Sequence, residues 1–183
     1  MEEMPRYCSR CGSGQLQMQI PPGDDRQRLV CTNCGKIHYQ NPKIVVGCLA
    51  VNDNKILLCK RNIEPRFGYW TIPSGFMENG ESAEEGAIRE CHEESGAHVK
   101  IEYLHTIYSL PQIHQVYLIF LAQVANPEGV HPTPESSEVR FFGASEIPWD
   151  KIAFAAVEYA LKKFVSEPPS KITYIASLPA HYR

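Results

Sequence analysis

Three glutamates near the middle of the chain are spaced as ligands of a divalent cation would be. Glu93 and Glu94 follow Glu90 by three and four residues, so in an α-helix the three carboxylates share an arc of about 100°. Carboxylates crowded on one helix face repel one another, and a bound hard cation relieves that repulsion. Because every ligand would be an oxygen atom, we expect Mg²⁺ or Mn²⁺ rather than zinc.

A simpler interpretation is a solvated helix face on which Arg89 pairs with Glu93 or Glu85. The glutamates stand within a longer series of glycine, glutamate and arginine residues, namely Gly75, Glu81, Arg89, Glu90, Glu93, Glu94 and Gly96. The residue types alone leave both interpretations open.

A second group of potential metal ligands lies near the N-terminus. Cys8 and Cys11 form one Cys-x-x-Cys pair, Cys31 and Cys34 form another, and 19 residues separate the two pairs. This spacing is typical of a four-cysteine zinc ribbon, in which four thiolates complete a closed, structural Zn²⁺ site. A redox pair or an iron–sulfur centre is the alternative that the spacing leaves open.

The three glutamates must be positioned by a helix that we expect from Ser82 to Ser95. Ser82 with Glu85 three residues later forms a capping box, and Gly96 is a suitable C-terminal stop. An apolar stripe beside the acidic arc is expected to lie against a sheet, and it comprises Ala83, Ala87, Ile88 and Cys91.

The remaining elements predict an α/β (α+β) fold with a mixed sheet. Strand-like runs cover Ile44–Val51, Lys55–Cys59, Val99–Tyr108, Val116–Val124 and Val139–Phe142. Helical apolar spacing runs from Trp149 to Phe164, and the tail after Ser166, with Tyr174, Ile175 and Leu178, is ambiguous.

Two domains are expected. Residues 1–41 hold few large apolar side chains and could not fold without a metal clamp, so we assign them to the zinc ribbon and residues 42–183 to the catalytic domain.

Composition limits the choice of partners. The net charge of −3 provides no basic field for nucleic acid. No run of 18 apolar residues suggests a membrane span, and the first residues lack the layout of a signal peptide. Three further cysteines, Cys48, Cys59 and Cys91, stand singly among apolar residues, which suits a reducing compartment. We therefore expect a cytoplasmic protein that holds any anionic substrate in a local site.

The series from Gly75 to Gly96 resembles the Nudix box, the signature of the Nudix hydrolase family, with Cys91 and Ala97 at its apolar positions. A chance match to the seven fixed positions of this box is very improbable, so the resemblance favours a metal site over a solvated helix face and implies a small-molecule nucleotide as substrate. The resemblance implies an α/β/α sandwich with a mixed sheet. It also implies a metal-dependent pyrophosphohydrolase that releases a nucleoside monophosphate, and homodimerisation is an expectation from the family alone.

The same resemblance implies roles for individual residues. Glu90, Glu93 and Glu94 would bind one to three Mg²⁺ or Mn²⁺ ions with the carbonyl of Gly75, while Arg89 would orient the carboxylates. The ions would bridge a diphosphate and lower the pKa of a bound water. The general base is either a box glutamate such as Glu93 or a glutamate of a later loop.

In that later loop the candidate base is Glu138, with Glu135 close by; both could equally be solvated charges. Four residues are candidates for substrate binding: Arg61 for a phosphate, Phe67 for stacking on a base, and Gln115 and Tyr117 in the segment where family members carry specificity residues. Trp70 is more typical of a core position.

The substrate is less constrained than the reaction. The proline- and tryptophan-rich signature of zinc-ribbon NADH pyrophosphatases is absent, and from the first cysteine to about Ala155 the chain resembles the plant chloroplast FAD and ADP-ribose pyrophosphatase. FAD or ADP-ribose is therefore expected. The alternatives are an NADH pyrophosphatase, a hydrolase that sanitises nucleoside triphosphates, and, outside enzymes, an effector-binding regulator or an RNA-binding zinc-ribbon protein.

Overall fold

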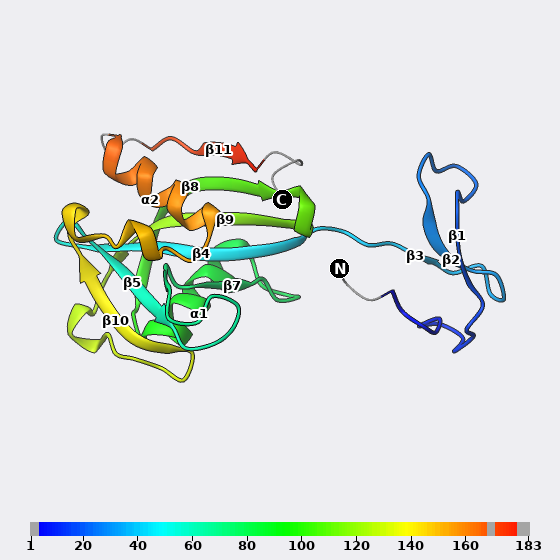
Figure 1. Ribbon diagram of the computed structural model, residues 1–183, viewed down its shortest axis with the longest axis horizontal. Helices are drawn as coiled ribbons and strands as arrows, with labels where there is room; N and C mark the ends of the chain where they lie inside the picture. The colour runs from blue at the N-terminus through cyan, green and yellow to red at the C-terminus, as the bar shows by residue number, and fades with distance from the viewer. Residues whose placement is uncertain (1–3, 168–170, 179–183) are drawn as a thin grey trace. The chain divides into compact units, whose positions relative to one another are not determined.

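The computed structural model describes residues 4–167 and 171–178. The sequence expectations for the last five residues of the tail lie outside this range. The chain divides into two compact units, Met1–Pro42 and Lys43–Arg183, and each is described by itself (Figure 1).

The first unit is a small antiparallel sheet with two cysteine turns. Its strands are β1 (Leu16–Gln19), β2 (Arg28–Cys31) and β3 (Ile37–His38), in the order β1-β2-β3. Each cysteine pair sits in a tight turn, closed by hydrogen bonds from Gly12 N–H to the Cys8 carbonyl (2.9 Å) and from Gly35 N–H to the Cys31 carbonyl (2.8 Å). Both glycines have positive φ, 70° and 72°, a conformation that glycine adopts without strain.

The second unit is built on an eight-stranded mixed sheet. Its main path has the order β10-β5-β4-β9-β8-β11, with β6 pairing with β5 and β7 with β4. The strands are β4 (Lys43–Asn52), β5 (Lys55–Arg61), β6 (Trp70–Thr71), β7 (Ser74–Phe76), β8 (Val99–Leu110), β9 (Gln115–Val124), β10 (Ser136–Phe142) and β11 (Tyr174–Ser177). The β4–β9 and β8–β11 pairs are parallel and the other pairs are antiparallel.

Two helices cover opposite faces of this sheet, α1 (Ala83–Ser95) and α2 (Ala155–Ser166). Alternate side chains of β4 point to opposite faces of the sheet, and each face packs against one helix. Val45 and Leu49 pack in a core cluster with α2, whereas Val46 and Cys48 pack in a second cluster with α1. The fold is thus an α/β/α sandwich with a mixed sheet, as expected.

The helix expected from Trp149 is shorter in the structure. Trp149–Lys151 is a 3₁₀ turn, and α2 begins at Ala155. The chain between them is extended because Ile152 forms a parallel bridge with Trp70 and Ala153 N–H donates to the Trp70 carbonyl (2.8 Å). Tertiary pairing therefore overrides the helical spacing in this segment.

Three short strands of the second unit were not expected from the sequence. β6 and β7 lie within a Gly- and Pro-rich loop, and β11 lies in the ambiguous tail, where Tyr174–Ser177 runs parallel to β8. Shorter 3₁₀ turns cover Pro111–Ile113, Pro127–Gly129 and Ala144–Glu146. Within the described ranges, no helix has the length and apolar character needed to cross a membrane.

Candidate active site

Helix α1 is fixed at both ends as the sequence predicts. The Ser82 hydroxyl accepts a hydrogen bond from Glu85 N–H (3.2 Å), and the Glu85 carboxylate accepts one from Ser82 N–H (2.8 Å). The helix ends at Gly96, whose φ of 70° is left-handed. Both caps set the start and the orientation of the turns that carry the glutamates.

The face that α1 turns to the sheet differs slightly from the expected stripe. Ala87 and Cys91 are fully buried, but Ile88 is 37% exposed. The close approach is made instead at Gly86, where an added Cβ would lie 2.9 Å from Val46 Cγ2 and 2.6 Å from Glu81 Oε1. The helix therefore rests on the sheet through its smallest residue, which rotates Ile88 outwards.

Arg89 is the hub of the acidic cluster. Its guanidinium forms two hydrogen bonds to the Glu81 carboxylate (2.7 and 3.0 Å), one to Glu90 (2.7 Å) and one to Glu93 (2.9 Å). The contact with Glu81 lowers the pKa of that carboxyl group to about 2. Arg89 thus orients carboxylates, and its partners are Glu81, Glu90 and Glu93 rather than Glu85.

The carboxylates of Glu94 and Glu90 are largely shielded from solvent. Glu94 is 7% exposed, and burial raises its pKa to about 7 although Ser74 N–H donates to the carboxylate (3.0 Å). Burial also raises the pKa of Glu90. Gly75 lies against the latter group: an added Cβ would come within 2.4 Å of the Glu90 carboxyl atoms. This set of oxygen donors, with its uncompensated charge, fits a hard divalent cation.

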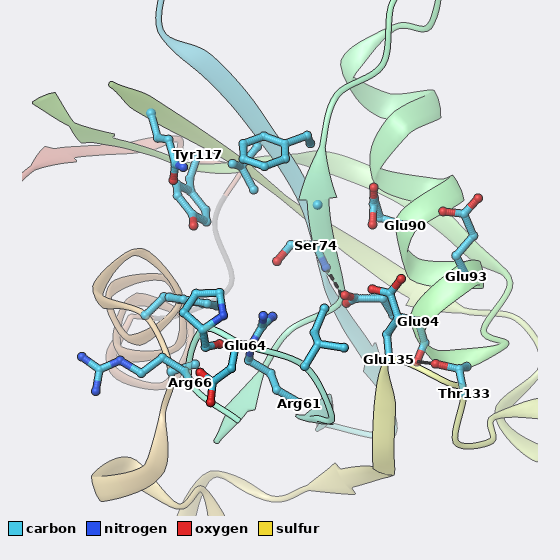
Figure 2. A pocket seen from close by; sticks show the side chains of 18 of the residues that line it. Arg61, Glu64, Arg66, Ser74, Glu90, Glu93, Glu94, Tyr117, Thr133 and Glu135 are labelled. Atoms are coloured by element: carbon cyan, nitrogen blue, oxygen red, sulfur yellow. Dashed lines mark hydrogen bonds between the residues drawn. The ribbon is translucent and has the colours of Figure 1, made fainter. Parts of the chain in front are cut away.

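The glutamates form one wall of a cavity of about 880 Å³. Figure 2 shows Glu90, Glu93 and Glu94 projecting from the helix on one side, with Arg61, Arg66 and Tyr117 on the other. The helix wall of the cavity is therefore acidic, and the wall opposite combines two arginines and an aromatic ring with one carboxylate, that of Glu64.

Of the expected substrate residues, Arg61, Gln115 and Tyr117 line the cavity and Phe67 does not. Phe67 is 59% exposed. Arg61 is held in place because its Nε donates to the Pro65 carbonyl (2.8 Å) and its guanidinium lies 5.0 Å from the ring centroid of Phe154.

Trp70 is a core residue, as expected. It is buried and forms an edge-to-face contact with Phe142 at 4.8 Å between ring centroids. Its ring is therefore not available for stacking on a base.

Glu135 lines the cavity, whereas Glu138 does not. A register shift between Ser136 and Glu138 pairs Ser136 with Arg61 and Glu138 with Lys60. Since neighbouring residues in a strand point to opposite faces, Glu138 lies on the Lys60 side, where Lys60 Nζ donates to its carboxylate (2.8 Å) and lowers its pKa. Nothing in the sequence signals this bulge, so the face on which Glu138 lies could not be predicted.

Several other lining residues were not identified from the sequence, namely Ser74, Thr133, Arg66 and Phe154. Each lies outside the box, in a loop or at the end of an element. Only the fold brings these positions to the glutamates, so no spacing in the sequence signals them.

The four cysteines of the first unit have the geometry of a tetrahedral metal site. Cys8 Sγ lies 3.7 Å from Cys34 Sγ, Cys11 Sγ lies 3.7 Å from Cys31 Sγ, and all four sulfur atoms lie within 4.8 Å of one another. Thiolates at about 2.3 Å from zinc would be about 3.8 Å apart. None of the four is in a disulfide. The Ser13 N–H, with the Asn33 side chain, lowers the pKa of Cys11 to about 6, whereas at Cys34 the effect of the Lys36 N–H is outweighed by burial and the neighbouring thiols, which raise the pKa of Cys34 to about 11.

Comparisons with protein families agree with both units. Residues 41–163 match the family model described as NUDIX domain, and residues 6–40 match the model described as Nudix N-terminal. The chain is 35% identical over 120 residues to an ADP-ribose pyrophosphatase of Methanocaldococcus jannaschii, covering 63% of this chain and 69% of that protein.

Other relatives are NAD-capped RNA hydrolases. The chain is 30% identical over 175 residues to NudC of Vibrio parahaemolyticus, which covers 91% of this chain and 64% of that protein. With Pseudomonas aeruginosa NudC the identity is also 30%, over 49% of that protein. The chain thus spans about half to two thirds of the length of these relatives.

Solved structures share the fold. A NUDIX hydrolase from Nitrosomonas europaea superimposes with a TM-score of 0.87 at 45% identity, covering 94% of this chain and 99% of that one. An ADP-ribose pyrophosphatase from Streptococcus suis superimposes with a TM-score of 0.60 at 20% identity, covering 74% of this chain and 99% of that one. This second similarity shows the fold alone.

Proposed function

We propose that this chain, which belongs to the Nudix hydrolase family, cleaves the diphosphate of an adenosine-containing compound. ADP-ribose and FAD are the first candidates. The observation that carries the proposal is the cavity in which the glutamates of α1 lie opposite Arg61, Arg66 and Tyr117. A diphosphate next to a base or sugar is complementary to such a cavity.

Glu90, Glu93, Glu94 and the carbonyl of Gly75 are proposed to hold Mg²⁺ or Mn²⁺, and the four cysteines are proposed to hold structural Zn²⁺. When bound, a hard divalent cation neutralises diphosphate oxygens and lowers the pKa of water. Arg89 holds Glu90 and Glu93 on the cavity side of the helix before any cation enters, since it contacts both carboxylates.

Glu135, rather than Glu138, is proposed as the general base because it lines the cavity on the side of the helix glutamates. In this role its carboxylate removes the proton of the attacking water. Arg61 is proposed to bind a phosphate, and Tyr117 and Phe154 to pack against the base or ribose, since all three line the cavity. Gln115 is retained as a specificity residue.

NAD-capped RNA is a second candidate substrate. The match to a NudC protein covers 91% of this chain, whereas the ADP-ribose pyrophosphatase match covers 63%. Its dinucleotide end would occupy the same cavity. Homodimerisation remains a prediction, which sedimentation of the purified protein tests.

A substrate panel tests the proposal. Initial rates with Mg²⁺ and with Mn²⁺ are compared for ADP-ribose, FAD, NADH, NAD-capped RNA and oxidised dGTP. We expect ADP-ribose or FAD to have the highest kcat/KM. Preference for oxidised dGTP would reassign the chain to triphosphate sanitation, and preference for NAD-capped RNA would select the second candidate.

A further inference from the structure

Glu135 is carried by a tight turn between β10 and the preceding loop. Thr133 N–H donates to the Ser136 carbonyl (3.0 Å), and Ser136 N–H donates to the Thr133 carbonyl (3.2 Å). These reciprocal bonds close the turn on itself, but they do not fix its place relative to α1. That place depends on contacts outside the turn.

Asn62 supplies two of these contacts. Its backbone N–H donates to the Glu135 carbonyl (2.8 Å), and its side-chain amide donates to the Pro134 carbonyl (3.0 Å). The β5–β10 ladder ends at the Arg61–Ser136 pair, so Asn62 continues the attachment where regular pairing stops. Two successive carbonyls next to the Glu135 side chain are thereby tied to the strand that bears Arg61.

Thr133 supplies a third contact, to the acidic helix itself. Its hydroxyl donates to the backbone carbonyl of Glu94 (3.3 Å). The carboxylate of the same glutamate accepts from Ser74 N–H. The Thr133 side chain thus connects the turn to Glu94, a proposed metal ligand.

We propose that Asn62 is a positioning residue for catalysis, which together with Thr133 sets the Glu135 carboxylate over the helix glutamates. The inference rests on the proposed role of Glu135. A displacement of about 1 Å in a reacting group costs on the order of 100-fold in rate, whereas the hydrogen bond of the Asn62 side chain is exposed. Its loss therefore affects turnover more than folding.

The test is a double-mutant cycle with ADP-ribose, or the panel compound that is cleaved fastest, at saturating Mg²⁺. Asn62→Ala, Glu135→Gln and the double variant are compared for kcat, KM and thermal midpoint. We expect Asn62→Ala to lower kcat by about 10- to 100-fold with KM nearly unchanged. In the Glu135→Gln background the same substitution should cost less than about twofold, because the group that it positions is already lost.

Thr133→Val is the second variant, which keeps the volume and removes the hydroxyl. We expect it to lower kcat as well. Asn126→Ala is the matched control: this amide also donates to a backbone carbonyl, that of Gly96 (3.2 Å), but it makes no described contact with the 133–136 turn. We expect it to leave kcat unchanged.

The outcomes separate this inference from the proposed function. If Glu135→Gln turns over at the wild-type rate, the base assignment fails and the positioning role fails with it. If Glu135→Gln is inactive while folded Asn62→Ala and Thr133→Val keep the wild-type kcat, only the positioning role is wrong. If the two fold-losses in kcat multiply in the double variant, Asn62 acts through a group other than Glu135. This result would also overturn the positioning role.

Discussion

At the scale of single residues, the acidic cluster makes a direct prediction about turnover. Glu93→Gln and Glu94→Gln each remove a charged ligand while preserving side-chain volume. We expect kcat to fall by about 100-fold or more with the fold retained, as measured by steady-state kinetics and circular dichroism. Glu84→Gln is the control, since Glu84 is an exposed residue of the same helix. Near-normal activity in both ligand variants would contradict the metal assignment.

The buried carboxyl group of Glu94 predicts a pH dependence. Burial raises its pKa to about 7 in the folded state, so the unfolded state loses its proton first as pH rises. The metal-free protein therefore loses stability between about pH 4.5 and pH 7, on the order of 2 kcal/mol. A cation binds only the ionised form, so Mg²⁺ should raise the thermal midpoint more at pH 8 than at pH 6.

Differential scanning fluorimetry with Mg²⁺ or with EDTA at the two pH values measures this difference. Glu94→Gln should reduce it, because the amide does not titrate and only Glu90 then keeps a raised pKa among the proposed ligands. Equal stabilisation of the wild-type protein at both pH values would contradict the prediction.

Much of the candidate site could be predicted from the sequence because its ligands are local. Glu90, Glu93 and Glu94 share one helix, and their spacing alone places them together. Glu135 and Phe154 come from separate loops, and only the folded sheet brings them to the cavity. Glu135 lines the cavity and Glu138 does not, because a single bulge in β10 reverses which face a residue occupies.

At the scale of elements, the capping box of α1 predicts a measurable loss of stability. Ser82→Ala removes the acceptor for Glu85 N–H. We expect a loss of about 1 kcal/mol, which corresponds to a fall of about 2–4 °C in the thermal midpoint. Ser145→Ala, at an exposed 3₁₀ position, should leave the midpoint unchanged. An equal effect in both variants would show that the cap does not stabilise the helix.

Elements with strong local signals were predicted best. The ends of α1 were identified from Ser82 and Gly96, and the long strands β4, β8 and β9 from their apolar runs. The start of α2 was placed too early because the preceding segment is extended by its pairing with Trp70. Short strands such as β11 carry too few residues to show a periodicity.

At the scale of the whole molecule, the cysteine unit predicts dependence on zinc. Its described part has only small strands, and a compact unit of this size needs a metal clamp. We expect about one zinc per chain by metal analysis of gently purified protein. Strong chelation or Cys31→Ser should make residues 4–42 sensitive to protease while the catalytic unit stays folded. Cys59→Ser, which replaces a buried thiol of the other unit, is the control. Gently purified protein without zinc would contradict the assignment.

The Arg89 hub also has a consequence for how metal and substrate depend on each other. Three ionised carboxylates, Glu81, Glu90 and Glu93, around one guanidinium leave a charge of −2, which one divalent ion can balance. A diphosphate entering afterwards brings new negative charge and new oxygen ligands. The substrate therefore attracts further ions as it binds. We expect the apparent affinity for substrate to increase as the cation concentration is raised.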